Sequence, residues 1–399
     1  MRIPPIILGV LLATAPPVVT CERTVHAANP PATPSESTPP VEDARLTAQV
    51  FHAALEAIRP AIVRIETVGG ASPVQTAEDA AGETHAAPAF RQADGPTTGV
   101  IWTSDGNILT SSFNFVRDPL VITVQLSDGR RFVAKLLARD RIARLALLKI
   151  DATSLPTPRL ASRNDLEPGD WLLTAGFGQG GDTPTISTGV LSGRGRMSGL
   201  ALQTDAKTSP ANYGGPTFDI DGRLAGICVP IGPGNDELAG VEWYDSGIGF
   251  AITIEQLTRR FERLRGGEDV ERGLMGVTFD PSTPTVPMVV LTTQPASRPT
   301  SGPATEASSR PTGRPVLVES SPCGGLLISE TSKGPAAGAG LQAGDCIVEL
   351  DGETVRNLLE FRREIINKAA GDRVEVGYVR DGARRTVTLV LVTAKEIGN

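Results

Sequence analysis

The sequence predicts a mainly β protein whose strands form barrels or a sandwich. Glycine (43 residues) and proline (32) are abundant while aromatic residues make up only 4%, which is typical of turn-rich β structure with irregular connections. Short apolar runs recur along the chain, and turn signals such as Asp128-Gly129 and Asp221-Gly222 separate them. Many short strands divided by turns favour a barrel or sandwich over a helical fold.

Residues 1–28 are predicted to be a secretory signal peptide. Arg2 precedes an apolar run from Ile6 to Ala13, and this run is too short to span a bilayer. A lipoprotein anchor at Cys21 is less favoured, because Thr20 is large for the position before a modified cysteine. We therefore expect a periplasmic or secreted protein, and we expect no transmembrane segment.

The predicted elements follow in order along the chain. Residues 29–45 are rich in Pro, Ser and Thr and are expected to be a disordered linker. A short helix over 46–58 ends before Pro60. Residues 70–95 lack periodicity and predict a flexible loop, and 257–264 predict a helix that leads to a Gly266-Gly267 hinge. Strand signals lie at 62–68, 121–126, 131–137, 171–175, 185–191 and 224–231.

Charge and cysteine content exclude several functions. With 399 residues, a net charge of −7 and no basic run, the chain suggests two to three domains and argues against nucleic-acid binding. The four cysteines lack a C-x-x-C spacing, so we expect no zinc site and no cofactor. Cys228 and Cys346 lie in apolar runs and are expected to be buried. A Cys323–Cys346 disulfide is the less favoured alternative.

Three motifs carry a family resemblance. Residues 203–216 read QTDAKTSPANYGGP, which resembles the active-site loop of trypsin-like serine proteases with Tyr213 at the position of the nucleophilic serine. Residues 99–116 read GVIWTSDGNILTSSFNFV and resemble the HtrA (DegP-like) proteases, with Phe113 at the catalytic histidine position. Residues 140–150 read DRIARLALLKI, where Arg144 takes the position of the catalytic aspartate.

The resemblance implies a fold and a domain order. It implies a chymotrypsin-like double six-stranded β-barrel over 46–265, with 247–252 as the strand that walls the specificity pocket. Residues 272–277 and the motifs at 327–352 resemble an HtrA-type PDZ domain, which we place at 270–395 with a helix at 357–368. Residues 280–321 are dense in Pro, Ser and Thr and predict a disordered insert. The peptide-binding residues implied are Gly273, Leu274, Met275, Gly276, Val277, Phe361 and Ile365.

The substituted triad predicts a pseudoprotease. Phenylalanine transfers no proton, arginine is positive where the base needs a negative partner, and tyrosine has an unperturbed pKa of about 10. The three histidines (His26, His52 and His85) all precede the matched barrels. Lys207 lies too close to Ser209 along the loop for a good Ser-Lys dyad, so we read it as a solvated lysine. In the implied fold Phe113, Arg144 and Tyr213 meet, and we expect the two rings to plug the cleft. Arg144 is expected either to stack on one of the rings or to turn outward.

Three functions remain open at this point. The leading one is an exported HtrA-like protein that is not an enzyme and binds peptides, protein C-termini or unfolded proteins as a chaperone, scaffold or regulator. The alternative is an active serine endopeptidase of periplasmic protein quality control that uses a non-standard nucleophile. The third is a regulator that co-assembles with an active relative. A homo-trimer is also left open.

Overall fold

The structure is a computed structural model, and it describes residues 40–68, 77–78, 84–85, 96–115, 118–178, 180–231, 247–280, 288–292, 314–318 and 323–397. The predicted signal peptide lies outside these residues. Within the described residues, no helix is both long and apolar enough to cross a membrane.

The first helix begins earlier than predicted. Helix α1 spans Pro40–Ile58 and continues into a 3-10 turn, η1, at Arg59–Ala61. The prediction of a disordered linker over 29–45 is therefore wrong for residues 40–45, which are helical. Residues 29–39 lie outside the described residues. Proline is tolerated in the first helical turn because its missing N–H would have no partner there, and Asp43 places negative charge near the same end. Ala54 and Ile58 are buried.

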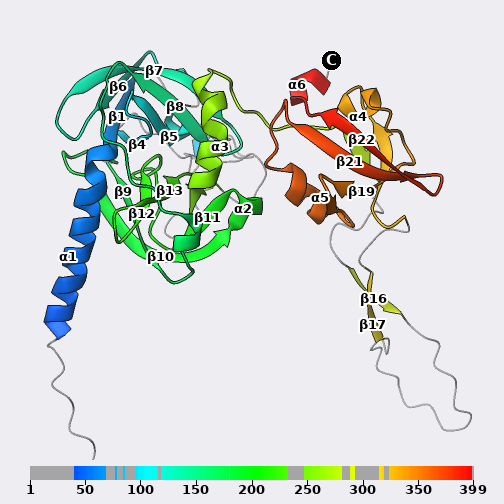
Figure 1. Cartoon of the computed structure of the whole chain (residues 1–399), viewed down its shortest axis with the longest axis horizontal. Helices are drawn as coiled ribbons and strands as arrows, with labels where there is room; N and C mark the ends of the chain where they lie inside the picture. Colours follow the sequence, from blue (N-terminus) through cyan, green and yellow to red (C-terminus); the bar gives the residue numbers. More distant parts are fainter. Residues whose placement is uncertain are drawn as a thin grey trace, which may run out of the picture. The chain divides into compact units, whose positions relative to one another are not determined.

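Two closed six-stranded barrels confirm the predicted chymotrypsin-like fold (Figure 1). The first has the strand order β1-β4-β5-β8-β7-β6. Its strands are β1 (Ile62–Val68), β4 (Thr97–Ile101), β5 (Asn107–Ser111), β6 (Val121–Gln125), β7 (Arg131–Asp140) and β8 (Leu145–Ile150). The predicted Asp128-Gly129 hairpin turn joins β6 to β7, with Gly129 at a left-handed φ of 89°.

The second barrel has the order β10-β11-β14-β13-β12-β9. Its strands are β9 (Trp171–Gly176), β10 (Thr185–Gly195), β11 (Ala201–Thr204), β12 (Pro216–Asp219), β13 (Leu224–Cys228) and β14 (Gly249–Thr253). Short helical turns connect strands in both barrels: η2 (Ser112–Phe115), η3 (Arg163–Asp165) and α2 (Arg196–Gly199). The loop predicted over 70–95 lies outside the described residues except for the paired strands β2 (Ala77–Glu78) and β3 (Thr84–His85).

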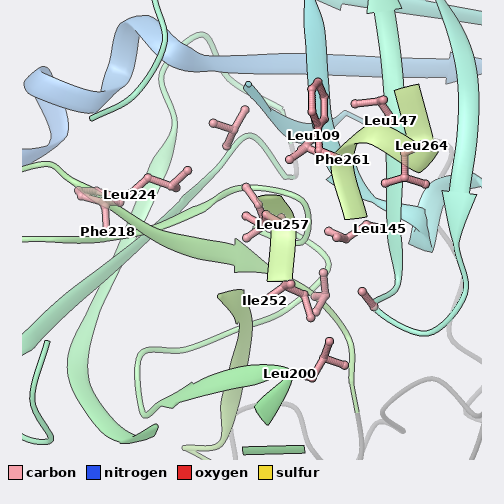
Figure 2. Packing of buried hydrophobic residues seen from close by; sticks show 14 of the residues in the cluster. Leu109, Leu145, Leu147, Leu200, Phe218, Leu224, Ile252, Leu257, Phe261 and Leu264 are labelled. Carbon is pink, nitrogen blue, oxygen red and sulfur yellow. The ribbon is translucent and has the colours of Figure 1, made fainter. Parts of the chain in front are cut away.

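One apolar cluster joins both barrels to helix α3 (Ile254–Arg265). Leu257, Phe261 and Leu264 are spaced to lie on one face of this helix, and all three are buried. Figure 2 shows them among barrel residues. These barrel residues include Leu109, Leu145 and Leu147 from the first barrel and Phe218, Leu224 and Ile252 from the second. The predicted helix at 257–264 is thus confirmed and is longer at its start.

The remaining residues form a PDZ-like sheet with the order β15-β18-β19-β21-β22, and β20 pairs with β19. Its strands are β15 (Val277–Phe279), β18 (Leu326–Thr331), β19 (Cys346–Leu350), β20 (Glu353–Thr354), β21 (Arg373–Arg380) and β22 (Ala383–Val390). Its helices are α4 (Pro335–Gly338), α5 (Leu358–Ile365) and α6 (Ala394–Ile397). Helix α5 is shorter than predicted, and the Asn357 side chain caps it by accepting the N–H of Glu360.

Two predictions for this region are corrected. Cys323 and Cys346 form a disulfide with Cα atoms 6.2 Å apart, so Cys346 is not simply a buried small residue. The insert predicted to be disordered over 280–321 contains an antiparallel strand pair, β16 (Met288–Thr292) with β17 (Arg314–Val318). Valine and leucine in both segments favour strands, and the Pro- and Ser-rich composition around them hid this signal. The rest of the insert lies outside the described residues.

A buried ion pair gives this sheet a pH-dependent stability. The carboxylate of Asp345 is fully buried and accepts hydrogen bonds from Arg380 at 2.6 and 2.7 Å and from the Gln342 N–H at 2.8 Å. Burial itself opposes ionisation, but these hydrogen bonds hold the pKa of Asp345 below its usual value. A folded pKa below the unfolded value of about 4 means that the carboxylate stabilises the fold above that pH. This stabilisation is lost as the pH falls through the folded pKa.

We therefore expect Asp345→Asn to lower the urea midpoint of the sheet clearly at pH 7 and less at pH 3, because pH 3 lies below the unfolded pKa of about 4 and part of the stabilisation by the ionised carboxylate has been lost there. Hydrogen exchange of the amides in β19 and β21 over a urea series, measured for both proteins at the two pH values, checks this. An equal loss of stability at pH 7 and pH 3 would show that the ionised pair is not the cause.

Candidate functional site

The three positions that the resemblance aligns with a protease triad come from three connections of the barrels. Phe113 lies in η2 after β5, Arg144 lies in the turn between β7 and β8, and Tyr213 lies in the loop between β11 and β12. Ser111 pairs with Leu145, which brings the first two connections together. The Arg144 carbonyl accepts the N–H of Ser112 at 2.8 Å. The Thr97 hydroxyl donates to the Tyr213 carbonyl at 3.1 Å and joins the second barrel's loop to the first barrel.

The rings of Phe113 and Tyr213 pack edge to face, so these two positions are neighbours, as the resemblance implied. Their centroids are 5.4 Å apart at an interplanar angle of 70°, and the residues are only 1% and 4% exposed. With Cys228 they form a separate buried cluster. Burial raises the pKa of the Cys228 thiol, so this residue stays protonated and is not a usable nucleophile. Apolar and aromatic groups therefore fill the position where a triad would need a base and an accessible hydroxyl.

Arg144 is held in an unusual backbone conformation. Its φ of 56° lies in the left-handed region, which most side chains avoid but which Asn and Asp tolerate. This is consistent with a position that carries aspartate in the proteases the sequence resembles. The side chain is half-buried, and its stacking on Phe113 or Tyr213 stays a prediction.

The ring contact predicts a measurable coupling between Phe113 and Tyr213. Edge-to-face aromatic pairs contribute about 0.5–1.5 kcal/mol beyond their buried area. In a double-mutant cycle with Phe113→Leu and Tyr213→Leu, the double variant should therefore be less destabilised than the sum of the two single variants by that amount. Urea unfolding of the four proteins measures it. Strict additivity would mean that the two rings act as independent apolar fillers.

The backbone amides next to Tyr213 are already occupied. In trypsin-like serine proteases the oxyanion is held by the N–H of the nucleophile and by that of the second residue before it, which correspond here to Tyr213 and Ala211. The Tyr213 N–H donates to the carbonyl of Ser209 at 3.2 Å, and the Ala211 N–H donates to the Ser209 side-chain oxygen at 3.3 Å. Neither amide is available to a developing oxyanion in this conformation.

Asn212 fixes the same loop from the other side. Its side-chain amide donates to the Lys207 carbonyl at 2.9 Å and to the Thr174 hydroxyl at 3.2 Å, while its Oδ1 accepts the Ser209 N–H at 2.9 Å. Gly214 has a φ of 84°, and a Cβ there would lie 2.3 Å from the Thr98 carbonyl oxygen. These hydrogen bonds and the close approach at Gly214 fix the backbone of the loop.

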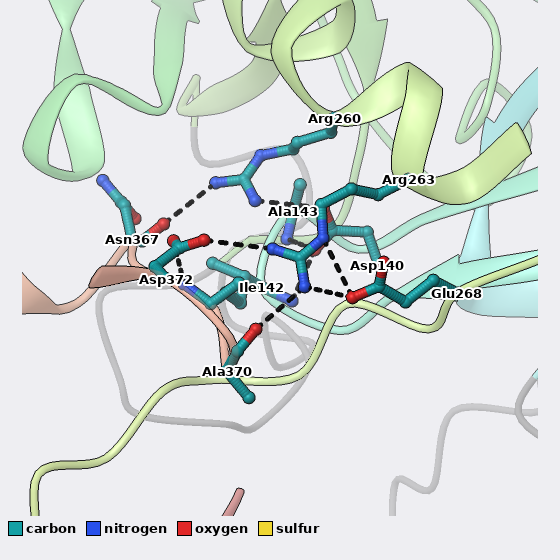
Figure 3. A network of polar contacts seen from close by, with 10 residues as sticks. Asp140, Ile142, Ala143, Arg260, Arg263, Glu268, Asn367, Ala370 and Asp372 are labelled. Atoms are coloured by element: carbon teal, nitrogen blue, oxygen red, sulfur yellow. Dashed lines mark hydrogen bonds and ion pairs between the residues drawn. The ribbon is translucent and has the colours of Figure 1, made fainter. Parts of the chain in front are cut away.

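A buried polar network supports the turn that carries Arg144 (Figure 3). One carboxylate oxygen of Asp140 accepts the N–H groups of Ile142 and Ala143 at 2.8 and 2.7 Å. The other accepts Arg260 Nη1 from α3 at 3.1 Å, with both side chains buried. Burial raises the pKa of Asp140, and Arg260 and the two N–H groups oppose that rise. The sequence analysis missed this pair, because only the fold brings residues 140 and 260 together.

The same helix contacts the loop that follows α5. Arg263 donates to Asp372 at 3.1 Å and to the Ala370 carbonyl at 2.8 Å, and Arg260 donates to the Asn367 carbonyl at 3.3 Å (Figure 3). The Asn367 side chain donates to the carbonyls of Met197 and Ser198 at 3.0 and 2.7 Å. Helix α3 is thus hydrogen-bonded to both the barrels and the PDZ-like sheet.

A second site is the groove of the PDZ-like sheet. All seven predicted peptide-binding residues line one cavity of about 350 Å³. Met275 and Phe361 are buried at its floor, and Phe279 packs on Phe361 with ring centroids 4.8 Å apart. Six further residues line the cavity without having been predicted from the sequence: Arg272, Phe279, Ser332, Arg362, Ile366 and Ile397. Ile397 comes from α6, and a Cβ on Gly276 would lie 3.7 Å from its Cδ1.

Two of the four backbone N–H groups in residues 273–276, part of the implied peptide-binding loop, are already used within the fold. The Gly273 N–H donates to the Lys368 carbonyl and the Leu274 N–H to the Val392 carbonyl, at 3.0 and 2.8 Å. Among the described residues, the N–H groups of Met275 and Gly276 have no acceptor. Gly276 has a left-handed φ of 77°, and successive amides in such a turn form a concave anion site. This pair of amides can receive a carboxylate at the end of an apolar groove.

The sequence matches two protein families. Residues 97–227 match the trypsin-like peptidase domain, and residues 273–391 match the PDZ domain. Among curated proteins, the chain is 31% identical over 303 residues to a probable periplasmic serine endoprotease, DegP-like, from Halomonas elongata, with 74% of this chain and 56% of the relative aligned. It is 29% identical to the protein of the same description from Ectopseudomonas mendocina, covering 77% of this chain and 58% of the relative. The chain therefore spans little more than half the length of these relatives.

Solved structures share the fold. A serine endoprotease from Yersinia pestis is 24% identical with a TM-score of 0.55, and the match covers 86% of this chain and 97% of that one. The HtrA-type protease AlgW, solved with a decapeptide, is 23% identical with a TM-score of 0.56, covering 86% of this chain and 98% of that one. At this identity the likeness concerns the arrangement of the barrels and the PDZ-like sheet.

Proposed function

We propose that this chain is an HtrA/DegP-like protein that binds peptides without cleaving them, because residues 97–227 match the trypsin-like peptidase domain, residues 273–391 match the PDZ domain and the curated relatives are described as DegP-like. The observation that carries the proposal is the contact between Phe113 and Tyr213. Two buried rings stand where a protease needs an imidazole base and an exposed hydroxyl. The groove, by contrast, keeps an apolar floor and two backbone amides without acceptors among the described residues.

The proposed ligand is an extended segment with a free C-terminus and an apolar last residue. Its carboxylate would accept the N–H groups of Met275 and Gly276. Its last side chain would pack on Met275, Phe361 and Ile365, and Ile397 would close the groove beside Gly276. Protein C-termini and unfolded chains present such segments, which fits a role as chaperone, scaffold or regulator.

The proposed compartment is the periplasm or the exterior of the cell. The curated relatives are named as periplasmic proteins. The Cys323–Cys346 disulfide supports the same compartment, because disulfides persist in oxidising environments. A homo-trimer and co-assembly with an active relative both remain compatible with this proposal.

Carboxylate capture predicts a clear effect of peptide amidation. Peptides that end in an apolar residue should bind with a dissociation constant roughly in the micromolar range, which corresponds to about 8 kcal/mol. Amidation of the C-terminus removes the charge and should weaken binding roughly tenfold or more, as expected for the loss of hydrogen bonds to a charged group. Isothermal titration of the acid and amide forms of one peptide measures this.

Two glycine variants make this experiment specific. Gly276→Ala strains a left-handed position and places a Cβ 3.2 Å from the Ser332 side-chain oxygen, so it should disturb the amide pair and reduce binding. Gly352→Ala strains a similar position, with a φ of 86° and no neighbour within 4 Å, and should leave binding unchanged. Equal peptide binding by the wild type, Gly276→Ala and Gly352→Ala would contradict carboxylate capture in this groove. Equal binding of the acid and amide peptides would contradict it as well.

A further inference from the structure

A cavity of about 200 Å³ opens into the second barrel. It lies at the end of the barrel away from the Tyr213 loop. That loop follows β11 at Thr204, whereas the cavity is lined at the other end of β11 and β14, where Ala201 pairs with Ile252 and α3 begins. Its interior is apolar and is formed by Ala161, Leu166, Leu191, Leu202 and Ala225.

The mouth of this cavity attracts negative charge. Helix α3 begins here, and the side chain of its N-cap residue, Thr253, makes no capping hydrogen bond. The N–H groups of Glu255 and Gln256 in the first turn have no acceptor among the residues that the structure describes. Unpaired amides at a helix N-terminus favour an anion. Arg194 and Arg259 are the two basic lining residues, with Arg194 Nη1 donating to the Leu166 carbonyl at 2.8 Å, and Glu255 is the one acidic residue among the lining residues.

A buried polar group in the wall also requires a partner. Gln256 is only 9% exposed and lines the cavity. Its Nε2 donates to the Gly199 carbonyl at 3.2 Å, which fixes the orientation of the amide. Its Oε1 is buried and has no hydrogen-bond partner in the described part of the chain. A buried carbonyl oxygen without a donor is costly, so a ligand with an N–H near this wall would be stabilised.

We propose that this cavity binds an N-acylated apolar amino acid through its carboxylate. The carboxylate would accept the first-turn amides of α3 and pair with Arg259. The adjacent amide N–H would donate to Gln256 Oε1, and the apolar side chain would enter the barrel. A cavity of about 200 Å³ is below the roughly 300–1,000 Å³ of drug-sized pockets, which limits the ligand to about one residue. A free acylated amino acid and the last residue of a peptide share this chemistry.

The test is photoaffinity labelling of the full-length protein with N-acetyl-leucine that carries a diazirine in its side chain. Mass spectrometry of the digest is expected to locate the label within 161–166, 191–202 or 253–259. Label within 272–279 or 361–366 would instead come from probe bound in the PDZ groove. The variant Gly276→Ala should remove the label in the groove and leave the label in the cavity unchanged. The experiment therefore tests ligand binding in the cavity separately from peptide binding in the PDZ groove.

Competition defines the ligand. N-acetyl-leucine should displace the cavity label, and N-acetyl-leucinamide, which lacks the carboxylate, should not. A pentapeptide ending in leucine distinguishes the sources: displacement by this peptide assigns the site to peptide C-termini as well, and failure assigns it to free acylated amino acids.

Two variants test the named residues. Arg259 is exposed and unpaired among the described residues, so Arg259→Glu should fold normally and lower cavity labelling roughly tenfold, the effect of one charge-assisted hydrogen bond. Gln256→Leu removes the unpartnered carbonyl oxygen and should also lower cavity labelling. Glu255→Gln removes the one negative charge among the lining residues and should raise cavity labelling. Absence of label from the three cavity segments, equal competition by the amide, or unchanged labelling of Arg259→Glu would overturn the proposal.

Discussion

Purified wild-type protein is expected to show no hydrolysis of casein or of ester substrates above background. Triad residues act as a unit, and loss of the unit costs about 10⁶-fold in kcat in a serine protease. Tyr213→Ser alone should not restore activity, because Phe113 offers no base and Arg144 offers no negative partner for one. A fluorophosphonate probe should label neither protein. Robust turnover by the wild type that such a probe inhibits would contradict this expectation.

A triple variant tests how far the site has departed from a protease. Phe113→His, Arg144→Asp and Tyr213→Ser together restore the residue types, and aspartate tolerates the left-handed φ at position 144. We still expect activity far below that of a protease, because the amides of Ala211 and Tyr213 donate to Ser209 instead of facing a substrate. Removal of one oxyanion donor alone typically costs about 10²–10³-fold in kcat. Protease-like rates in the triple variant would show that this loop rearranges easily.

Arg260→Met is expected to destabilise the barrels by about 3–5 kcal/mol, the usual effect of leaving one partner of a buried ion pair uncompensated. Its partner Asp140 is completely buried and also accepts two backbone N–H groups in the turn before β8. The loss should appear as a lower urea midpoint with an unchanged slope.

A matched pair of variants separates charge from packing at this site. Asp140→Asn combined with Arg260→Met removes both charges but keeps an oxygen that accepts the two N–H groups, so it should cost less than Arg260→Met alone. Arg130→Met breaks an exposed ion pair with Asp128 and should change stability by no more than about 0.5 kcal/mol. If the double variant loses as much stability as Asp140→Asn and Arg260→Met lose together, the uncompensated charge of Asp140 is not the cause of the destabilisation by Arg260→Met.

The sequence predicted the fold well because the motifs around the three substituted positions are long and ordered. Ile108-Leu109-Thr110 and residues 145–150 are the buried strands β5 and β8, so the residues that identify them are also those that pack the first barrel. The contact between Phe113 and Tyr213 followed from the same register. The first residues of helix α1, 40–45, and the strands β16 and β17 were missed, because composition rich in proline and serine was interpreted as disorder.

Other features depend on distances that no pattern in the sequence contains. The Cys323–Cys346 disulfide, the Asp140–Arg260 pair and the cavity near Gln256 each bring together residues from separate elements. The free amides of the groove could not be assigned either. Glycines 273 and 276 look equivalent in the motif, but the Gly273 amide is used by a contact with Lys368.

The measurement that tests the central claim most directly is native mass spectrometry of the full chain incubated with an unstructured peptide that ends in an apolar residue. We expect a complex whose ligand retains the full mass of the peptide after prolonged incubation, and whose amount falls with the amidated peptide and with Gly276→Ala. Shortened peptide, formed in proportion to enzyme and abolished by a serine-protease inhibitor, would contradict the account.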